Sequence, residues 1–255
     1  MTEIIMQGAD VQAEGRPKRF LLVVDGDAAH LYYTGILLQR LEYVIHTTKM
    51  AEDALEILNV AMPSLILTDT SLLRMNGLEF LKEIKKNPKT REIPVLVYSL
   101  SRDTALREAC LNEGAAAFLP KPVDPEELYA AIQKATEERP RSYIRLTTCL
   151  NVIIGSGQVA GAESRNECVT AISEHGMYVS TSKPYPAGSQ VSMTLLLGNA
   201  SMKIDGRVLY SFDNSKSPLR TPGMGIKFSR INPGDQALIK AFIGKQITGG
   251  LRQAE

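Results

Sequence analysis

Three arginines lie close together near the middle of this 255-residue chain. Arg139, Arg141 and Arg145 fall within seven residues. Each guanidinium is a planar fork of donors that stays protonated, which suits a phosphate or the edge of a guanine. The spacing alone also fits a solvated basic linker, because Arg-x-x-x-Arg often occurs by chance. These arginines therefore form a candidate anion-binding segment whose meaning depends on the elements around it.

Polar residues that could form a second site stand at or just after the ends of apolar runs in the first half of the chain. They are Asp25, Asp27, Asp69, Ser99 and Lys121. Short apolar runs that end in polar groups are typical of buried parallel strands, and ligands bind at the carboxyl ends of such strands. Carboxylates are also the ligands that a hard cation such as Mg2+ takes. We therefore expect these side chains to converge in space.

The first half alternates five predicted strands with five predicted helices. The strands are expected at residues 20–24, 43–47, 65–68, 95–99 and 117–119. Four helices are expected at residues 31–41, 51–58, 78–86 and 104–113, and a fifth is capped by Asp124 and begins at Pro125. This alternation predicts an α/β fold, a doubly wound five-stranded parallel sheet with helices on both faces.

The residues at the ends of these strands follow a known pattern. Residues 65–77 read LILTDTSLLRMNG, and Ser99 and the segment FLPKP at 118–122 follow in order. This pattern resembles the receiver domain of bacterial response regulators over about residues 18–138. The resemblance implies that Asp69 is the phosphoacceptor, a carboxylate nucleophile that forms an acyl phosphate. It also implies supporting roles at the phosphorylation site for Asp25, Ser99, Lys121 and Phe118.

Two positions depart from the receiver pattern. Receivers usually have two consecutive acids after the first strand to hold Mg2+, and here Gly26 follows Asp25. The resemblance therefore implies a weakened Mg2+ site at Asp25 and Asp69, unless Asp27 or water replaces the missing ligand. Leu100 stands where receivers prefer a small residue that leaves the site open. Two interpretations remain: a phosphorylated receiver, or a receiver fold kept as an interaction or dimerisation module.

From residue 144 onward the apolar periodicity changes to two, which predicts strands. They are expected at residues 144–154, 168–172, 177–181, 190–197, 202–212 and 224–228. About six antiparallel strands favour a small β-barrel, because closure removes exposed strand edges. Gly155-Ser156-Gly157 is interpreted as the start of a hairpin loop that reaches Asn166, since no helix follows it as a phosphate-binding loop requires. A final helix at about 235–246 is expected to face inward through Leu238, Ile239 and Phe242.

Segments of the second half carry another resemblance. Residues 141–145, 172–179 and 223–228 read RSYIR, ISEHGMYV and GMGIKF, and together they resemble the PilZ domain over about residues 139–246. Many PilZ domains bind cyclic di-GMP. The resemblance implies these ligand residues: Arg141, Arg145, Ser173 and Gly176, with Arg139 as a helper.

The PilZ-like motif also has one departure and one alternative explanation. Ala171 stands where the motif normally has Asp or Asn, so a hydrogen bond to the guanine edge is missing at a cost of about 1–3 kcal/mol. Alternatively, Ser173 and Gly176 only shape a turn, and the arginines pair with receiver carboxylates.

Charge and cysteine content indicate the kind of partner and the cellular compartment to expect. Residues 1–138 carry 15 Lys and Arg against 21 Asp and Glu, a net charge of −6, whereas residues 139–255 carry 14 against 7, a net charge of +7. A basic second half suggests an anionic partner. Cys110, Cys149 and Cys168 are an odd number without CxxC spacing, so we expect packing residues in a reducing compartment.

The ends and the apolar segments of the chain predict its location. No segment approaches the roughly 18 consecutive apolar residues of a membrane span. We expect a cytoplasmic protein with a disordered tail at residues 1–17 and a C-terminal tail at 247–255.

These observations favour a two-component response regulator with a PilZ output domain that binds cyclic di-GMP and relays its signal through protein contacts. The partners implied by the resemblance are a sensor histidine kinase, a downstream protein and a second copy bound through the receiver. The alternative is a scaffold that binds neither phosphate nor nucleotide. DNA binding is not expected, because no helix-turn-helix follows the receiver. An enzyme is not expected either, since no nucleophile–base pair is recognised.

Overall fold

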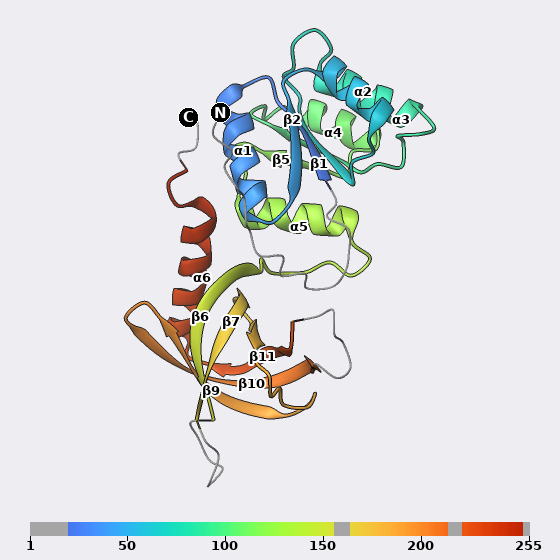
Figure 1. Cartoon of the computed structure of the whole chain (residues 1–255). Helices are drawn as coiled ribbons and strands as arrows, with labels where there is room; N and C mark the ends of the chain where they lie inside the picture. The colour runs from blue at the N-terminus through green and yellow to red at the C-terminus, as the bar shows by residue number, and fades with distance from the viewer. Residues whose placement is uncertain (1–19, 156–163, 214–220, 252–255) are drawn as a thin grey trace, which may run out of the picture. The chain divides into compact units, whose positions relative to one another are not determined.

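The computed structural model describes residues 20–155, 164–213 and 221–251 (Figure 1). Within these residues the chain forms two compact units. The receiver unit consists of residues 20–144 and 242–251, and the barrel unit consists of residues 145–155, 164–213 and 221–241. The predicted disordered tail at 1–17 lies outside the described residues, as do most of the predicted loop after Gly155 and the last four residues of the predicted C-terminal tail.

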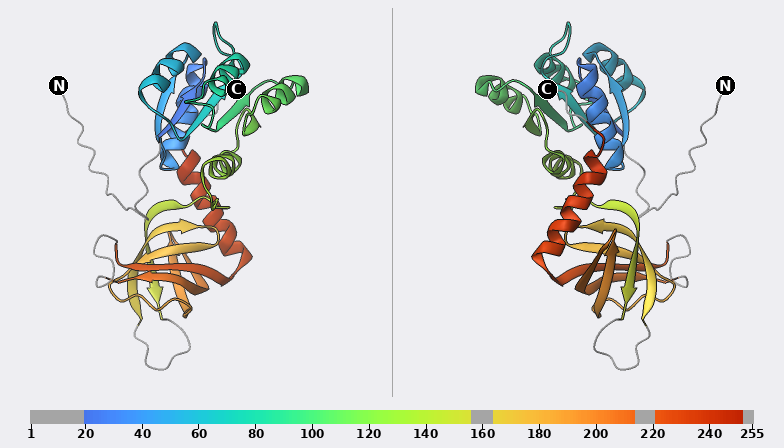
Figure 2. Two further views of the ribbon diagram at one scale, coloured as in Figure 1. Left: turned by 90° about the vertical axis from the view of Figure 1, so that its right-hand side faces the viewer. Right: turned by 90° about the vertical axis from the view of Figure 1, so that its left-hand side faces the viewer.

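The receiver unit is built on a five-stranded parallel sheet in the order β2-β1-β3-β4-β5. Its strands are β1 (Phe20–Val24), β2 (Val44–Thr48), β3 (Leu65–Asp69), β4 (Val95–Ser99) and β5 (Ala117–Pro120). Its helices are α1 (Ala28–Arg40), α2 (Ala51–Val60), α3 (Gly77–Lys86), α4 (Thr104–Asn112) and α5 (Pro125–Thr136). Helices α1 and α5 cover one face and α2, α3 and α4 cover the other (Figures 1 and 2). The predicted doubly wound α/β fold is confirmed.

Burial explains why the central strands read as continuous apolar runs. Every residue of β3 and β4 is buried, whereas the edge strand β2 has no buried residue. Strands covered on both faces have no solvent side, so period-two alternation disappears. The predicted cap of the fifth receiver helix is also confirmed, because the Asp124 carboxylate accepts hydrogen bonds from the amides of Glu126 and Glu127 at the start of α5.

The barrel unit is a closed six-stranded antiparallel barrel in the order β10-β11-β8-β7-β6-β9. Its strands are β6 (Leu146–Ile154), β7 (Arg165–Ser173), β8 (Gly176–Ser180), β9 (Gln190–Leu197), β10 (Ala200–Phe212) and β11 (Gly223–Ile231). Alternate residues face the interior, as in β9, where Val191, Met193 and Leu195 are buried. The predicted small barrel is confirmed, including the antiparallel pairing of β6 with β7 that the Gly155 hairpin implied.

The last helix, α6 (Pro233–Thr248), is longer at both ends than the sequence pattern predicted. Ile239 is fully buried and Phe242 is partly buried. The prediction for Leu238 was wrong: its side chain is 49% exposed. Residues 239 and 243 are one turn apart on the buried face, and the 100° step between neighbours places residue 238 off that face.

The end of α6 is bonded within the receiver unit. Arg40 Nη1 donates to the carbonyl oxygens of Ile247 at 2.9 Å and Gly249 at 2.8 Å. These carbonyls lie in the last turn of the helix and just beyond it, where helix carbonyls lack partners inside the helix. The residues at 247 and 248 expected to begin a tail are therefore helical.

The cysteines do not all pack in a core. Cys110 is buried as predicted, but Cys149 is exposed and Cys168 is only partly buried. The prediction of a packing role was therefore wrong for Cys149, because that position lies on the outer face of β6.

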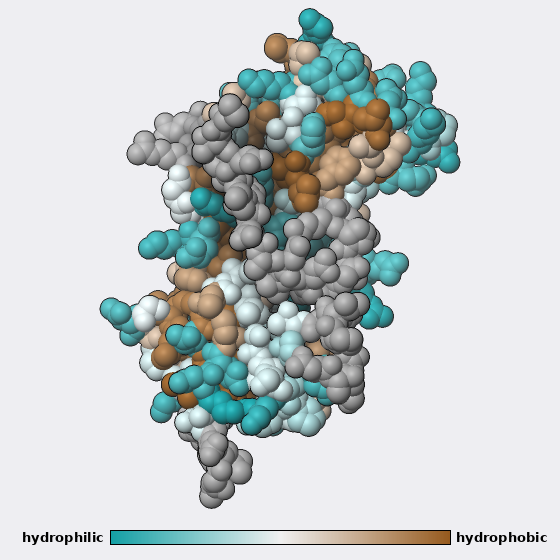
Figure 3. Space-filling model, in the orientation of Figure 1, coloured by the Kyte–Doolittle hydropathy of each residue, from teal (hydrophilic) through white to brown (hydrophobic). Residues whose placement is uncertain are grey.

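The surface mixes polar residues with apolar ones, and some of the apolar residues gather in groups (Figure 3). Large exposed apolar side chains include Tyr32, Val60 and Leu73 in the receiver unit and Leu209 and Tyr210 in the barrel unit. Single apolar side chains at a surface are normal. In the part of the chain that the structure describes, no helix is both long and apolar enough to cross a membrane.

Replacement of Gly77 by Ala should destabilise the receiver unit. A Cβ at this position would overlap the backbone carbonyl oxygen of Asp69, whereas the nearest atom to a Cβ at Gly26 is 3.4 Å away. We expect Gly77→Ala to lower the free energy of unfolding by about 1–3 kcal/mol, since backbone must shift. Urea denaturation followed by circular dichroism measures this, with Gly26→Ala as the matched control. Equal losses in the two variants would contradict the steric explanation.

Candidate functional site

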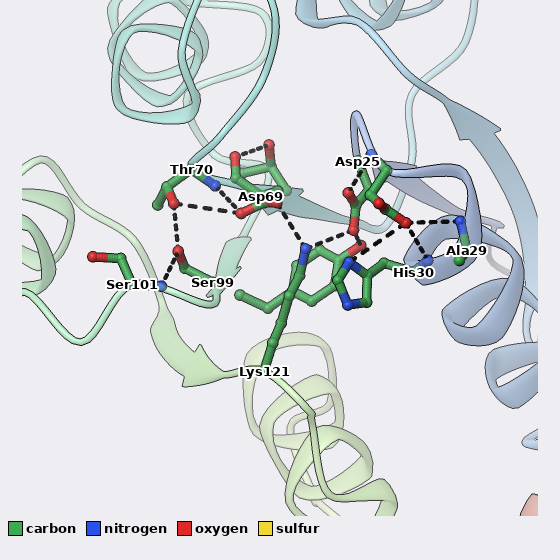
Figure 4. Close-up of polar contacts among 11 residues, drawn as sticks. Asp25, Ala29, His30, Asp69, Thr70, Ser99, Ser101 and Lys121 are labelled. Atoms are coloured by element: carbon green, nitrogen blue, oxygen red, sulfur yellow. Dashed lines mark hydrogen bonds and ion pairs between the residues drawn. The ribbon is translucent and has the colours of Figure 1, made fainter. Parts of the chain in front are cut away.

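The carboxyl ends of β1, β3 and β5 bring three charged residues together (Figure 4). Lys121 Nζ lies 2.7 Å from Asp25 Oδ2 and 2.7 Å from Asp69 Oδ2. All three residues are buried. The order β2-β1-β3 places this group where the direction of sheet winding reverses, the usual ligand site of such sheets. The predicted convergence of Asp25, Asp69 and Lys121 is confirmed.

Tyr98 takes part in the same group and was missed by sequence reasoning. Its hydroxyl donates to Asp25 Oδ2 at 2.5 Å, and its ring lies 4.3 Å from Lys121 Nζ. Burial, followed by the negative charge of Asp25, raises the pKa of Tyr98, so the phenol stays protonated and donates. A buried tyrosine hydroxyl requires a hydrogen-bond partner, so a tyrosine inside an otherwise aliphatic strand was the available signal.

Ser99 and Asp69 are linked through Thr70. The Thr70 backbone amide donates to Asp69 Oδ1 at 2.6 Å, and the Thr70 and Ser99 hydroxyls form a hydrogen bond. Ser99 Oγ also accepts from the amide of Ser101 at 3.1 Å. Both hydroxyls are buried beside the Asp69 carboxylate (Figure 4). This places donors on the side of Asp69 opposite to the Lys121 contact.

Two other residues singled out from the receiver pattern lie in contrasting surroundings. Phe118 is partly buried and packs against the hydrophobic core cluster of the unit, so it is not a solvent-facing aromatic. Leu100 is 60% exposed, so its side chain is not buried over the Asp69 carboxylate.

The acidic side chains do not form a three-carboxylate metal site. Asp27 caps α1, where its Oδ1 accepts from the amides of Ala29 and His30, and these bonds lower its pKa. Every carboxylate oxygen of Asp25 and Asp69 already accepts a hydrogen bond from the chain. Among the residues that the structure describes, no group of three His, Cys, Asp or Glu could hold a metal.

This arrangement does not fit a tightly bound Mg2+, which needs several oxygen ligands in near-octahedral array. The Lys121 ammonium lies between the two carboxylates, and the second acid after β1 is missing at Gly26. Among the described residues, the predicted Mg2+ site at Asp25 and Asp69 therefore lacks a third carboxylate ligand.

A second candidate edge lies at one end of the barrel, where β6 begins and β7 ends. The register pairs Leu146 with Ile172, so Arg145 and Ser173 are the next residues opposite each other. Arg145 is exposed. Ser173 Oγ donates to the Gly176 carbonyl oxygen at 3.1 Å in the β7–β8 turn. A hydroxyl that donates one bond retains acceptor capacity, so Ser173 can still accept from a ligand.

Gly176 has a structural explanation, and Ala171 lies beside an irregularity in the strand pairing. A Cβ at Gly176 would lie 2.5 Å from the Ile226 carbonyl oxygen, so the pairing of β8 with β11 requires glycine. Ala171 pairs with Thr147 and Tyr178 next to a register shift in β7.

The two remaining arginines belong to the receiver unit by position. Arg139 is exposed, and Arg141 is half-buried. The Arg141 amide donates to the side-chain carbonyl of Gln133 in α5 at 3.2 Å, and Gln133 in turn donates to Tyr43 Oη at 3.0 Å. These bonds attach the backbone at Arg141 to the last receiver helix.

Comparison with known proteins matches both halves of the chain. A family model of the response regulator receiver domain matches residues 21–133, and a model of the PilZ domain matches residues 133–245. The two-component response regulators ORR3 and ORR11 of Oryza sativa subsp. indica are 32% and 34% identical over 113 and 118 residues. These alignments cover 44% and 45% of this chain and 86% and 78% of the relatives.

A solved structure of a response regulator receiver domain protein from Clostridium thermocellum is also similar to this chain. It has 27% identity and a TM-score of 0.44, and the match covers 46% of this chain and 94% of that one.

Restoration of the missing acid should create a metal site. A Cβ at Gly26 meets no atom closer than 3.4 Å, so a carboxylate can be added there. We expect Gly26→Asp to tighten Mg2+ binding at least about tenfold, because a hard cation gains a charged oxygen ligand. Combination with Tyr98→Phe should tighten it further, since Asp25 then loses a competing donor. Calorimetric titration with Mg2+ measures both effects, and Gly26→Asn, which adds an uncharged oxygen, is the matched control. Equal affinity of wild type and Gly26→Asp would contradict the explanation.

Proposed function

Because this chain belongs to the two-component response regulators and carries a receiver domain followed by a PilZ domain, we propose that it binds cyclic di-GMP and relays signals through protein contacts. The nucleotide part of the proposal is supported by the β6–β7 register: Leu146 pairs with Ile172, so the adjacent residues Arg145 and Ser173 belong to the same barrel edge. A guanidinium and a hydroxyl at one edge offer a charge-assisted donor for phosphate and a short polar group for a base.

The second part of the proposal concerns phosphorylation. Asp69 is a buried carboxylate held between the Lys121 ammonium and the Thr70 amide. An acyl phosphate formed there would replace the carboxylate with a group of greater negative charge. Lys121, the Thr70 amide and the Ser99 hydroxyl are the donors nearest to that position, and such donors stabilise a transferring phosphoryl group. We assign Asp69 the role of phosphoacceptor, with a sensor histidine kinase as phosphate source.

The scaffold alternative is favoured by specific contacts. Gly176 is required for strand pairing, Ser173 supports the turn, and Asp25 is occupied by Tyr98 and Lys121. A chain in which both sites have lapsed would retain these contacts, since they are structural. Ligand titration separates the two functions.

Removal of the two arginines should strongly weaken nucleotide binding. We expect full-length protein to bind cyclic di-GMP in a saturable manner, and Arg141→Ala/Arg145→Ala to weaken binding at least about 100-fold, because each charged hydrogen bond contributes about 1.5–3 kcal/mol. Isothermal titration calorimetry of both proteins measures this. The absence of heat with wild type at high micromolar nucleotide would remove the ligand part of the proposal and favour the scaffold.

Matched variants control for charge and for the motif departure. Arg141→Lys/Arg145→Lys keeps the charge but loses the planar fork, and should bind more weakly than wild type. Lys203→Ala removes an exposed charge from the β9–β10 pair and should bind like wild type. Ala171→Asn restores a side chain that can bond guanine, and should tighten binding about tenfold.

Phosphorylation should depend on Asp69 alone. Incubation with acetyl phosphate is expected to add one phosphoryl group slowly to the wild type and none to Asp69→Asn, as measured by intact mass. Gly26→Asp should accelerate the reaction in Mg2+, because phosphoryl transfer relies on charge neutralisation. A phosphoryl group that persists in Asp69→Asn would assign the acceptor elsewhere, and no modification of wild type or Gly26→Asp would leave the receiver as an interaction module.

A further inference from the structure

Two thiols on neighbouring strands of the barrel lie in direct contact. Cys149 Sγ in β6 is 3.4 Å from Cys168 Sγ in β7. We propose that this pair is a reversible redox site, at which a low-molecular-weight disulfide such as oxidised glutathione converts the two thiols to an intramolecular disulfide.

The strand register brings the two thiols onto one face. Asn151 pairs with Cys168 and Leu150 pairs with Val169, so Cys149 is the diagonal neighbour of Cys168. The buried side chains of β6, Val152 and Ile154, point into the barrel. Cys149 alternates with them, and its exposure places the pair on the outer face, where a small oxidant can reach it.

The backbone near the pair is irregular. The β6–β7 register shifts between Thr147 and Leu150, which includes Cys149, and the β7–β8 register shifts between Val169 and Ala171. The intervening Thr170 hydroxyl is buried without a hydrogen-bond partner among the described residues. Diagonal positions are wider apart than a disulfide normally spans, so closure must draw the strands together. Interrupted ladders are the places where a sheet can make such an adjustment.

The two thiols have different roles in the reaction. Cys149 is exposed and therefore attacks first: its thiolate displaces one glutathione thiolate from the oxidant and forms a mixed disulfide. Cys168 then loses its proton to water or buffer and attacks Cys149 Sγ, which releases the second glutathione. One oxidant disulfide is reduced to two thiols while the protein dithiol is oxidised to one disulfide, so atoms and electrons balance.

Electrostatics agrees with this order. Burial, together with the hydrogen bond that the Cys168 thiol shares with Cys149, raises the pKa of Cys168, so Cys168 holds its proton in the resting protein. It becomes the resolving thiol only when a mixed disulfide lies beside it. Cys110 is buried in α4 of the other unit.

The cross-link has a consequence that rests on the proposed function. It would tie β6 to β7 a few residues from Arg145 and Ser173, the residues that follow the Leu146–Ile172 pair at the end of the same strand pair. Formation of the disulfide at the register shift would move the backbone of β6 relative to β7 and would thereby displace Arg145 from Ser173. We expect the oxidised protein to bind cyclic di-GMP about tenfold more weakly, the effect of one misplaced hydrogen bond to a charged group.

Mass spectrometry of the full-length protein tests the redox site without reference to nucleotide. Treatment with oxidised glutathione should remove two hydrogens from the intact mass, and the non-reduced digest should contain a linked peptide that joins Cys149 to Cys168. Dithiothreitol should reverse both changes. A stable glutathione adduct on wild type, or a link only between two chains, would overturn the proposal.

Single variants test the assigned roles. Cys168→Ser should accumulate one glutathione on Cys149, because no resolving thiol remains, whereas Cys149→Ser should react slowly and Cys110→Ser should behave like wild type. Loss of two hydrogens that persists in Cys149→Ser would overturn the assignment.

Titration of reduced and oxidised protein with cyclic di-GMP then tests the consequence. Failure of the reduced protein to bind would contradict the proposed function alone, and equal affinities would remove the regulatory role while the mass result decides the redox site.

Discussion

The Lys121 ammonium between Asp25 and Asp69 is the contact on which the receiver edge depends. Two buried carboxylates at the ends of adjacent strands repel each other unless a cation lies between them. Lys121 provides that cation through 2.7 Å contacts to both groups. A buried charge costs several kcal/mol to desolvate, so each member of such a group requires the others. The loop after β5 therefore supplies the positive charge that lies between the carboxylates from β1 and β3.

Tyr98 alters what this edge can do. Where a second acid would give the edge an excess of negative charge for a metal, the chain has Gly26, and the tyrosine hydroxyl bonds the one remaining acid. Two donors, Tyr98 and Lys121, thus share Asp25 Oδ2. Each carboxylate oxygen of Asp25 and Asp69 therefore has a hydrogen-bond partner within the chain, although Gly26 stands where a second acid would be.

The barrel obeys a different constraint, the register of antiparallel pairs. A shift of one residue would send every side chain of a strand to the opposite face. The β6–β7 register fills the interior with Val152, Ile154 and Val169, and the same register brings Arg145 and Ser173 to one edge and Cys149 beside Cys168. A candidate ligand edge and a thiol pair are therefore consequences of how the interior packs.

Much of this architecture follows from the sequence by itself. Buried parallel strands read as apolar runs, and their carboxyl ends must meet, so the order of elements and the convergence of Asp25, Asp69 and Lys121 were predictable. Period-two segments separated by turns likewise predicted the small barrel. Local signals such as Asp124 before Pro125 act within one turn of helix, which is why that cap was also predictable.

Only the tertiary structure decided the contacts between residues that share no local pattern. Tyr98 bonds Asp25 across 73 positions of sequence, and Asp27, next but one to Asp25, instead caps a helix. The Cys149–Cys168 contact lies beside two register shifts, and the exposure of Leu238 depends on which face of α6 is covered. Such contacts are set by packing between elements, whose free energy depends on neighbours in space, whereas sequence periodicity records only which residues are apolar and at what interval.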